Sequence, residues 1–204
     1  AGRRPSREDD GHSWGGWRSC GVAPRRQHKS GVLKTAYLGL IGLIAAERVF
    51  EIFLSNRNLR WALAEGGREV GRGHFPAMVA LHALFLPACV LEVWLLDRSF
   101  TPAVGGPMLL LVALTMTLRY WAISTLGRRW NTRVVVLPGR PRICDGPYRF
   151  MRHPNYLAVV VEIAAVPLVF GAWWTALAFS TGNLLVLRTR LRVEEAALRA
   201  ANGA

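Results

Sequence analysis

The sequence predicts an all-α integral membrane protein with about five transmembrane segments, the last two forming a helical hairpin. Of its 204 residues, 51% are hydrophobic and only 19% are charged, whereas charged residues make up ~25% of an average soluble domain. The hydrophobic residues are also gathered into long runs, and a helix needs ~20 of them to cross a bilayer core of ~30 Å. A soluble all-α protein is the weaker alternative, because no helical period of polar residues runs along these segments.

Three apolar runs are long enough to span a membrane: Val32–Leu54, Phe75–Leu96 and Ala103–Leu126. Two shorter runs follow, Tyr156–Phe170 and Ala172–Leu187, and only Gly171 separates them. We interpret these two as a hairpin that does not span fully, or that spans a locally thinned bilayer. The alternative is one long buried helix, but Pro167 and Gly171 argue against it, since both residue types interrupt helices.

Residues 1–31 are rich in Gly, Arg, Ser and Trp without any periodic pattern, so we expect a disordered basic tail. The tail is too long, and lacks a clear cleavage site, for a signal peptide. Residues 32–204 are then expected to form one membrane domain. The three cysteines, Cys20, Cys89 and Cys144, are far apart, so neither a disulfide framework nor a metal site is predicted.

The net charge of +13 would suggest nucleic acid as the partner of a soluble protein. Here the Lys and Arg residues lie mostly in the tail and loops, so we expect a membrane surface and no nucleic acid. With three helices and a hairpin, residues 55–74, residues 127–153 and the tail after Leu187 share one side. They hold fifteen Lys and Arg against nine opposite. The positive-inside rule therefore favours the cytoplasmic face of a bacterial-type inner membrane for this side.

The most informative polar segment reads GPYRFMRHPNY, from Gly146 to Tyr156. Pro154 fits the first turn of the helix that follows and keeps His153 extended, just outside the helix N-terminus. Free N–H groups at that position favour an anion. Tyr156 follows within one turn and offers a ring and a hydroxyl. Taken alone, these residue types are equally typical of the interfacial belt of a membrane protein.

A second polar cluster, RLRVEE, runs from Arg190 to Glu195 and should continue the last helix into water. Arg190 and Glu194 are four residues apart and share one face, whereas Glu195 points about 100° away. A solvated ion pair is the ordinary interpretation of such spacing. Because the hairpin returns the chain to the side it left, His153 and Glu195 should nevertheless lie at the same membrane depth.

Six ionisable residues interrupt the apolar helices: Glu47, Arg48, Glu51, Glu92, Arg119 and Glu162. Such groups are costly in a membrane and suggest function. Arg48 can pair with Glu51 along one helix, and Arg119 could neutralise Glu92 or Glu47 across helices. A structural polar network is one interpretation, and a lining for the head of an amphiphilic substrate is the other. We expect His82 to be an interhelical hydrogen-bonding group rather than a base.

The sequence GPYRFMRHPNY, an apolar hairpin and RLRVEEAAL together resemble the carboxy-terminal half of the isoprenylcysteine carboxyl methyltransferase family. Membrane phospholipid methyltransferases share a similar layout. The resemblance is strong from Leu126 to Leu198. Upstream, Glu47-Arg48, Arg57-Asn58 and the Gly71–His74 loop resemble a bacterial branch associated with O-methylation of alkylpyrones.

This resemblance implies that S-adenosyl-L-methionine binds in a cytosolic pocket of a catalytic half spanning about 126–198. The residues that would surround the cofactor are Tyr148, His153, Pro154, Asn155 and Tyr156. Glu194 or Glu195 would face its cationic end or the reacting centre, and Arg190 would lie near the carboxylate of the acceptor. No metal is implied.

The expected reaction transfers a methyl group to a carboxylate or acidic hydroxyl oxygen of a lipophilic acceptor, which is a small molecule or a lipid-modified group. Such an acceptor has a pKa near ~4 and is already ionised at neutral pH, so no general base is required. Phospholipid N-methylation is the enzymatic alternative, and a carboxylate such as Glu195 would then become a candidate base. A non-enzymatic membrane scaffold is the alternative from another class.

Overall fold

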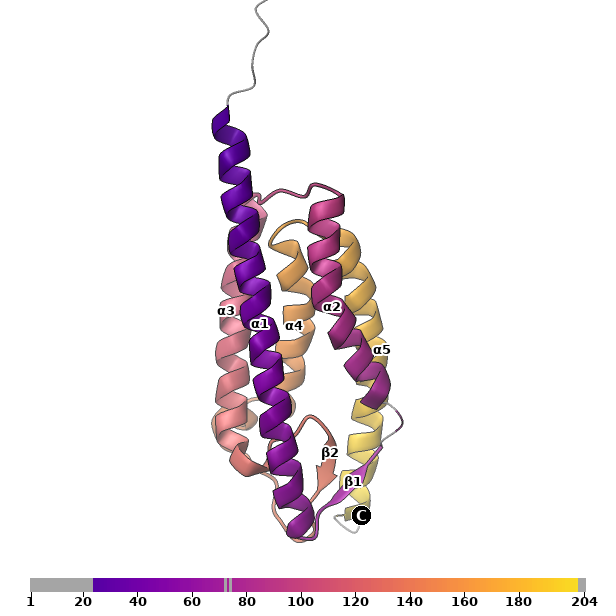
Figure 1. Ribbon diagram of the computed structural model, residues 1–204. Coiled ribbons are helices and arrows are strands. Elements are labelled where there is room, and N and C mark those ends of the chain that lie inside the picture. The colour runs from indigo at the N-terminus through magenta and orange to yellow at the C-terminus, as the bar shows by residue number, and fades with distance from the viewer. Residues whose placement is uncertain (1–23, 72, 74, 202–204) are drawn as a thin grey trace, which may run out of the picture.

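The computed structural model describes residues 24–71, 73 and 75–201, and the first 23 residues of the expected tail lie outside this part of the chain. Five long helices make up most of the described protein: α1 (Pro24–Ala64), α2 (Phe75–Leu95), α3 (Pro102–Leu126), α4 (Pro154–Leu168) and α5 (Trp173–Ala201). They stand side by side as one elongated bundle (Figure 1). Residues 24–31, which were expected in the tail, form the first turns of α1.

The hairpin prediction is confirmed, because α4 and α5 are separate helices that pack against each other. The chain reverses at Gly171, whose positive φ of 65° suits a glycine. The alternative of a single long helix is therefore wrong. Glu92 of α2 fastens the start of α5, since its carboxylate accepts hydrogen bonds from Thr175 N at 2.6 Å and Thr175 Oγ1 at 2.8 Å. A carboxylate at this position also complements the positive end of the helix dipole.

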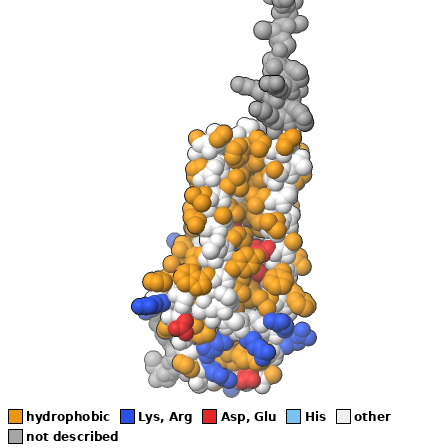
Figure 2. All heavy atoms as spheres, turned by 90° about the vertical axis from the view of Figure 1, so that its left-hand side faces the viewer, with side chains coloured by type: hydrophobic (Ala, Val, Ile, Leu, Met, Phe, Trp, Pro, Cys, Tyr) orange, Lys and Arg blue, Asp and Glu red, His pale blue; other side chains and the backbone are white. Residues whose placement is uncertain are grey.

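Two of the described helical segments, Phe75–Leu95 and Pro102–Arg129, are long and apolar enough to cross a membrane. In each, only 22% of the apolar window is buried inside the bundle, whereas the core helix of a soluble protein would be mostly buried. Hydrophobic side chains cover the body of the bundle, and Lys and Arg gather at one end (Figure 2). The other helices do not meet the same test, so the count of five spans stays a prediction.

A two-stranded ribbon was not expected in an all-α protein. Strand β1 (Arg68–Val70) pairs antiparallel with β2 (Val134–Val136), and Glu69 lies opposite Val135. Three residues are too few to show an alternating pattern in the sequence. The ribbon joins the loop after α1 to the loop after α3, and the pair Arg133–Glu69, at 2.8 Å, reinforces it.

The three polar regions predicted to share one side do meet at one end of the bundle. Ser55 contacts Asn131, and Glu65 binds Arg140, so the end of α1 lies against the chain after α3. The end of α5 reaches the same place, because Arg190 binds Tyr156 at the start of α4. Figure 1 shows both strands and the end of α5 at this polar end.

Candidate functional site

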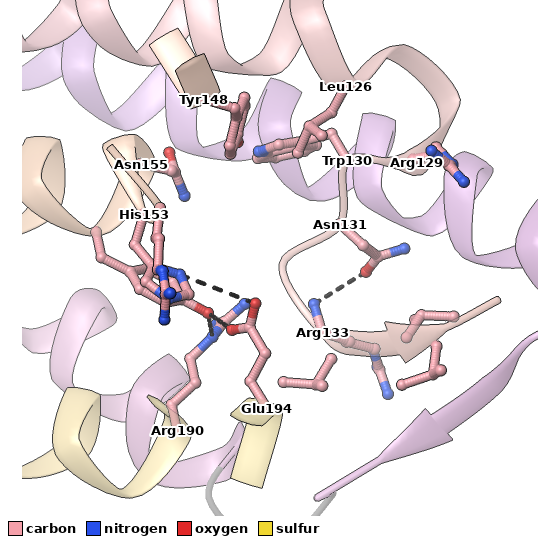
Figure 3. Close-up of a pocket in the computed structure, with 15 residues that line it drawn as sticks. Leu126, Arg129, Trp130, Asn131, Arg133, Tyr148, His153, Asn155, Arg190 and Glu194 are labelled. Carbon is pink, nitrogen blue, oxygen red and sulfur yellow. Dashed lines mark hydrogen bonds and ion pairs between the residues drawn. The ribbon is translucent and has the colours of Figure 1, made fainter. Parts of the chain in front are cut away.

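A pocket of about 150 Å³ opens at the polar end of the bundle. Its walls come from the loop after α3, strand β2, the short 3-10 helix η3 (Gly146–Arg149), the start of α4 and the last part of α5 (Figure 3). Six of the residues singled out in the sequence line it, namely Tyr148, His153, Asn155, Tyr156, Arg190 and Glu194. Segments separated by more than forty residues therefore converge here, through the fold of the α4–α5 hairpin.

Tyr148 is held in the wall by a tight approach of η3 to α3. The turn begins at Gly146, which has φ of 55°, and a Cβ atom there would lie 2.4 Å from Oγ1 of Thr125. Only glycine allows this backbone and this spacing. Burial, reinforced by the negative charge of Glu194, raises the pKa of Tyr148 to about 12. Its hydroxyl therefore stays neutral at physiological pH.

His153 and Pro154 lie as the sequence predicted, at the start of α4. His153 caps the helix, and its carbonyl accepts hydrogen bonds from the N–H groups of Tyr156 and Leu157. The imidazole stacks on the Tyr156 ring, with ring centroids 5.1 Å apart. Burial lowers the pKa of His153 and outweighs the opposing attraction of Glu194. Pro154 itself is buried and is not part of the pocket wall, although it was among the residues expected to surround a cofactor.

Tyr156 joins Arg190 to Glu194 in a continuous hydrogen-bonded chain. Arg190 Nε donates to the Tyr156 hydroxyl oxygen at 2.8 Å, and the same hydroxyl donates to Oε2 of Glu194 in a short hydrogen bond. Figure 3 shows Arg190 and Glu194 meeting beside His153, whose Nδ1 lies 4.0 Å from Oε1 of Glu194. Glu195, which was a candidate site residue together with Glu194, is not part of the pocket wall. Neighbouring helix positions differ by a rotation of about 100°, so the two carboxylates point in different directions.

Sequence reasoning missed the segment after α3, which supplies much of the wall. Trp130 is 2% exposed, and its Nε1 has no hydrogen-bond partner among the described residues. The same holds for Oδ1 of Asn155 across the pocket. The sequence signal for this segment was Trp130 and Asn131, which lie between the basic residues Arg129 and Arg133. Without the fold, that signal resembles an ordinary interfacial loop.

Helix α1 holds this segment in place through two buried polar side chains. The Asn58 amide donates to the carbonyl oxygens of Gly127, at 3.2 Å, and Trp130, at 2.8 Å. Ser55 Oγ accepts a hydrogen bond from the Thr132 N–H at 3.0 Å. The pocket wall is therefore fastened to a helix far away in the sequence.

A second and larger cavity, of about 800 Å³, lies between α1, α2, α4 and α5 and has mostly apolar walls. Four residues belong to the walls of both cavities: Trp130, Asn155, Tyr156 and Arg190. On the side of the larger cavity, Arg190 Nη1 points at the Met78 thioether, with 2.9 Å between nitrogen and sulfur. The polar pocket and the apolar cavity therefore share a wall that includes the guanidinium of Arg190 and the phenol of Tyr156.

Five of the six ionisable residues within the apolar helices form one cluster between α1, α3 and α4: Glu47, Arg48, Glu51, Arg119 and Glu162. Arg48 binds Glu51 at 2.6 Å, as predicted, and also Glu162 at 2.7 Å. Arg119 binds Glu51 at 2.6 Å and approaches Glu162 at 3.4 Å. The nearest approach of Arg119 to Glu47 is 3.9 Å.

The suggested pairing of Arg119 with Glu92 is wrong, because Glu92 lies at the other end of the bundle and binds Arg98 at 3.0 Å. His82 bonds the carbonyl of Met78 on its own helix, and not a neighbouring helix as expected. These contacts fit the structural interpretation of the cluster, although Arg48, Glu51 and Arg119 also line the larger cavity.

Comparison with known proteins places these features in a family. The isoprenylcysteine carboxyl methyltransferase family matches residues 108–200. The uncharacterised protein YpbQ of Bacillus subtilis is 33% identical over 160 residues, which cover 78% of this chain and 95% of that protein. The chain belongs to the isoprenylcysteine carboxyl methyltransferase family.

An uncharacterised protein of Haemophilus influenzae is 27% identical over 157 residues, covering 76% of this chain and 90% of that protein. No solved structure is detectably similar. Isoprenylcysteine carboxyl methyltransferases are membrane-associated methyltransferases, and the two long apolar helices agree with a membrane location. The family match runs from α3 to α5 and includes every residue of the segment from Tyr148 to Glu194. Helix α1, which holds the pocket wall and lines the larger cavity, lies outside this match.

Proposed function

We propose that the protein is a membrane methyltransferase that takes its methyl group from S-adenosyl-L-methionine. The proposed acceptor is a carboxylate or acidic hydroxyl oxygen on a lipophilic molecule that enters sideways from the bilayer. One observation carries the proposal: the polar pocket and the apolar cavity share Trp130, Asn155, Tyr156 and Arg190. Methyl transfer between a polar cofactor and a lipid requires two such compartments that touch, because the reacting atoms must approach within ~3–3.5 Å.

The polar pocket has groups suited to this cofactor. The bound cofactor supplies a methyl group already activated on a positively charged sulfur. The carboxylate of Glu194 and the aromatic rings of Tyr148 and Tyr156 are groups that attract a cation. The unpartnered Trp130 N–H and Asn155 oxygen offer a donor and an acceptor for its polar edges.

The pocket, at about 150 Å³, is smaller than a typical ligand site of ~300–1,000 Å³. The cofactor would therefore extend toward the residues shared with the apolar cavity, where its methyl group must meet the acceptor.

Arg190 is suited to hold the acceptor oxygen. One of its N–H groups faces the Met78 sulfur, which is a weak hydrogen-bond acceptor. An anionic oxygen in the larger cavity would be a much stronger partner. The acceptor is ionised without a base, so the role of Arg190 is to hold it in line, and orientation can supply up to ~7–11 kcal/mol.

A cationic side chain at the shared wall favours an anionic acceptor over an amine. A protonated amine would be repelled by Arg190, so phospholipid N-methylation fits less well. The ionised enol of an alkylpyrone and the carboxylate of a lipid-modified cysteine share the required chemistry, an anionic oxygen on an apolar chain. We place the pocket on the cytoplasmic face of a bacterial-type inner membrane, where the charge distribution of the loops favours it.

Isothermal titration of the detergent-purified protein with S-adenosylhomocysteine tests the cofactor assignment. We expect the wild type to bind and His153→Ala to bind more weakly, because the stacked imidazole lines the pocket. Glu195→Ala, which changes a residue outside the pocket wall, is the matched control and should bind more nearly as the wild type does. If the well-folded wild type does not bind, the cofactor assignment is wrong and the scaffold alternative is favoured.

A further inference from the structure

We infer that the apolar cavity contains a hydrogen-bonding subsite, formed by Asn183 and His82, that receives a hydroxyl group on the tail of the acceptor. The inference rests on the proposed function, since it assigns the larger cavity to a lipophilic acceptor. Both residues line that cavity, and neither belongs to the polar pocket. The subsite is therefore separate from the place where the methyl group is transferred.

Asn183 supplies an unused donor. It lies on α5, directly before the apolar run Leu184–Leu187, and is only 4% exposed. Its side-chain Nδ2 has no hydrogen-bond partner among the described residues. An amide N–H that is buried without a partner is destabilising, so a ligand oxygen that accepts from it recovers the lost interaction.

His82 supplies the complementary acceptor. Its Nδ1 lies 2.8 Å from the carbonyl oxygen of Met78. A carbonyl can only accept, so Nδ1 must carry the proton, and Nε2 of the neutral ring is left as an acceptor. An amide donor and an imidazole acceptor together match a hydroxyl, which donates one hydrogen bond and accepts others.

The packing of α2 against α5 turns both side chains to the same side. Leu81 touches α5 at Gly182, where an added Cβ atom would lie 3.1 Å from Cδ1 of Leu81. The two helices run antiparallel (Figure 1). The next residue along each helix is turned by about 100° from the contact residue, and in an antiparallel pair both turns lead to the same side. These next residues are His82, after Leu81, and Asn183, after Gly182. Both accordingly reach the cavity.

The subsite lies deeper in the bundle than the reacting end. Asn183 precedes Arg190 by seven residues, which corresponds to about 10 Å along α5. Apart from Arg190, the ionic residues of the same cavity are Arg48, Glu51 and Arg119, and these are bound to one another or to Glu162. Their hydrogen-bonding groups are engaged in the structural cluster. Asn183 and His82 are therefore the polar groups best placed to read a hydroxyl along the chain of an acceptor.

Matched fatty acids test this subsite directly. The probes are stearic acid and a set of monohydroxystearic acids whose hydroxyl stands progressively further from the carboxylate. Binding is measured by titration of the full chain in detergent, for the wild type, Asn183→Leu, His82→Phe and the control Thr189→Val. The control removes a hydroxyl on α5 that bonds only the Leu185 carbonyl, outside the cavity.

We expect one hydroxystearic acid to bind the wild type about tenfold more tightly than stearic acid does. Asn183→Leu and His82→Phe should lose that preference, and Thr189→Val should keep it. Asn183→Leu should also bind S-adenosylhomocysteine as the wild type does and unfold at no lower temperature, since it removes a buried Nδ2 donor that has no partner among the described residues. Unchanged cofactor-product binding and an unchanged unfolding temperature would show that the variant is folded, so that a lost preference for the hydroxyl reflects the subsite.

Equal binding of stearic acid and every hydroxystearic acid, or no binding of any of them, would overturn the subsite. A preference that persists in Asn183→Leu would also overturn it, and would indicate that the amide binds only water. The proposed function has a separate readout. If the folded wild type fails to bind S-adenosylhomocysteine but prefers a hydroxystearic acid, the methyltransferase assignment fails while the subsite stands.

Discussion

At the residue scale, the site depends on one phenol oxygen that serves two charged partners. The Tyr156 hydroxyl accepts a hydrogen bond from Arg190 and donates one to Glu194, so it bridges the guanidinium and the carboxylate. Arg190 faces the apolar cavity as well, whereas Glu194 lines only the polar pocket. Under the proposed function, the two charges would serve different ligands, with an anionic acceptor oxygen at Arg190 and the cationic sulfur of the cofactor at Glu194.

The charge of Glu194 should therefore discriminate the cofactor from its demethylated product. We expect Glu194→Gln to weaken binding of S-adenosyl-L-methionine by about tenfold and that of neutral-sulfur S-adenosylhomocysteine much less, because only the former carries the sulfonium charge. Parallel titrations of both ligands measure the ratio. An equal loss for both would show that Glu194 acts through shape or through Tyr156, and not through its charge.

His153 should make stability depend on pH. Burial lowers its pKa in the folded protein below the ordinary value of 6.5. The unfolded chain therefore binds the proton more readily, and stability falls as the pH drops from about 6.5 through the lowered folded pKa. We expect thermal unfolding of His153→Gln to depend less steeply on pH in this acidic window. An unchanged slope would mean that other groups govern the acid sensitivity.

At the element scale, α1 acts as a brace for the pocket. Its last turns extend beyond the apolar run and carry Ser55 and Asn58 to the segment after α3. The ribbon of β1 and β2 fastens the same segment from the other direction. The wall that contains Trp130 is thereby held by α1 and β1, which both lie outside the region that matches the family.

Removing the α1 brace should affect both folding and binding. Asn58→Ala leaves the carbonyl oxygens of Gly127 and Trp130 without their amide donor, so we expect a loss of about 1–3 kcal/mol in the free energy of unfolding. Binding of S-adenosylhomocysteine to the remaining folded protein should also weaken. Asn56→Ala, which changes an exposed residue of the same helix, is the control. Equal stability of the two variants would contradict the brace.

At the scale of the whole molecule, the bundle has an apolar body and one polar end. The pocket, the ribbon and most basic loop residues lie together at that end (Figures 1 and 2). A membrane around the body would leave the pocket at the water interface and the larger cavity at the depth of the lipid. This arrangement suits a soluble cofactor and a lipid acceptor that approach from different phases.

The orientation can be measured with the native cysteines. Cys144 is exposed at the polar end, and Cys89 is fully buried between helices. In a Cys20→Ser background, a membrane-impermeant maleimide should label Cys144 in inside-out vesicles and not in intact spheroplasts. Detergent-solubilised protein provides the labelling control. Labelling in spheroplasts would reverse the proposed orientation and place the pocket outside the cytoplasm.

The sequence by itself determined the helical segments, the hairpin and the cap at the start of α4. These features depend on local signals: apolar runs of membrane length, the break at Gly171, and a proline that fits only the first turn of a helix. The pairing of Arg48 with Glu51 could also be predicted, since side chains three residues apart on a helix lie next to each other. Local geometry was sufficient for all of them.

Only the tertiary structure decided which distant side chains meet. It paired Arg119 with Glu51 in place of Glu92, brought Trp130 into the pocket wall and selected Glu194 over Glu195 for that wall. Each outcome depends on how helices are rotated and placed against one another, and a change of one residue turns a side chain by about 100°. That rotation is set by packing between segments far apart in the chain, so no local pattern records it.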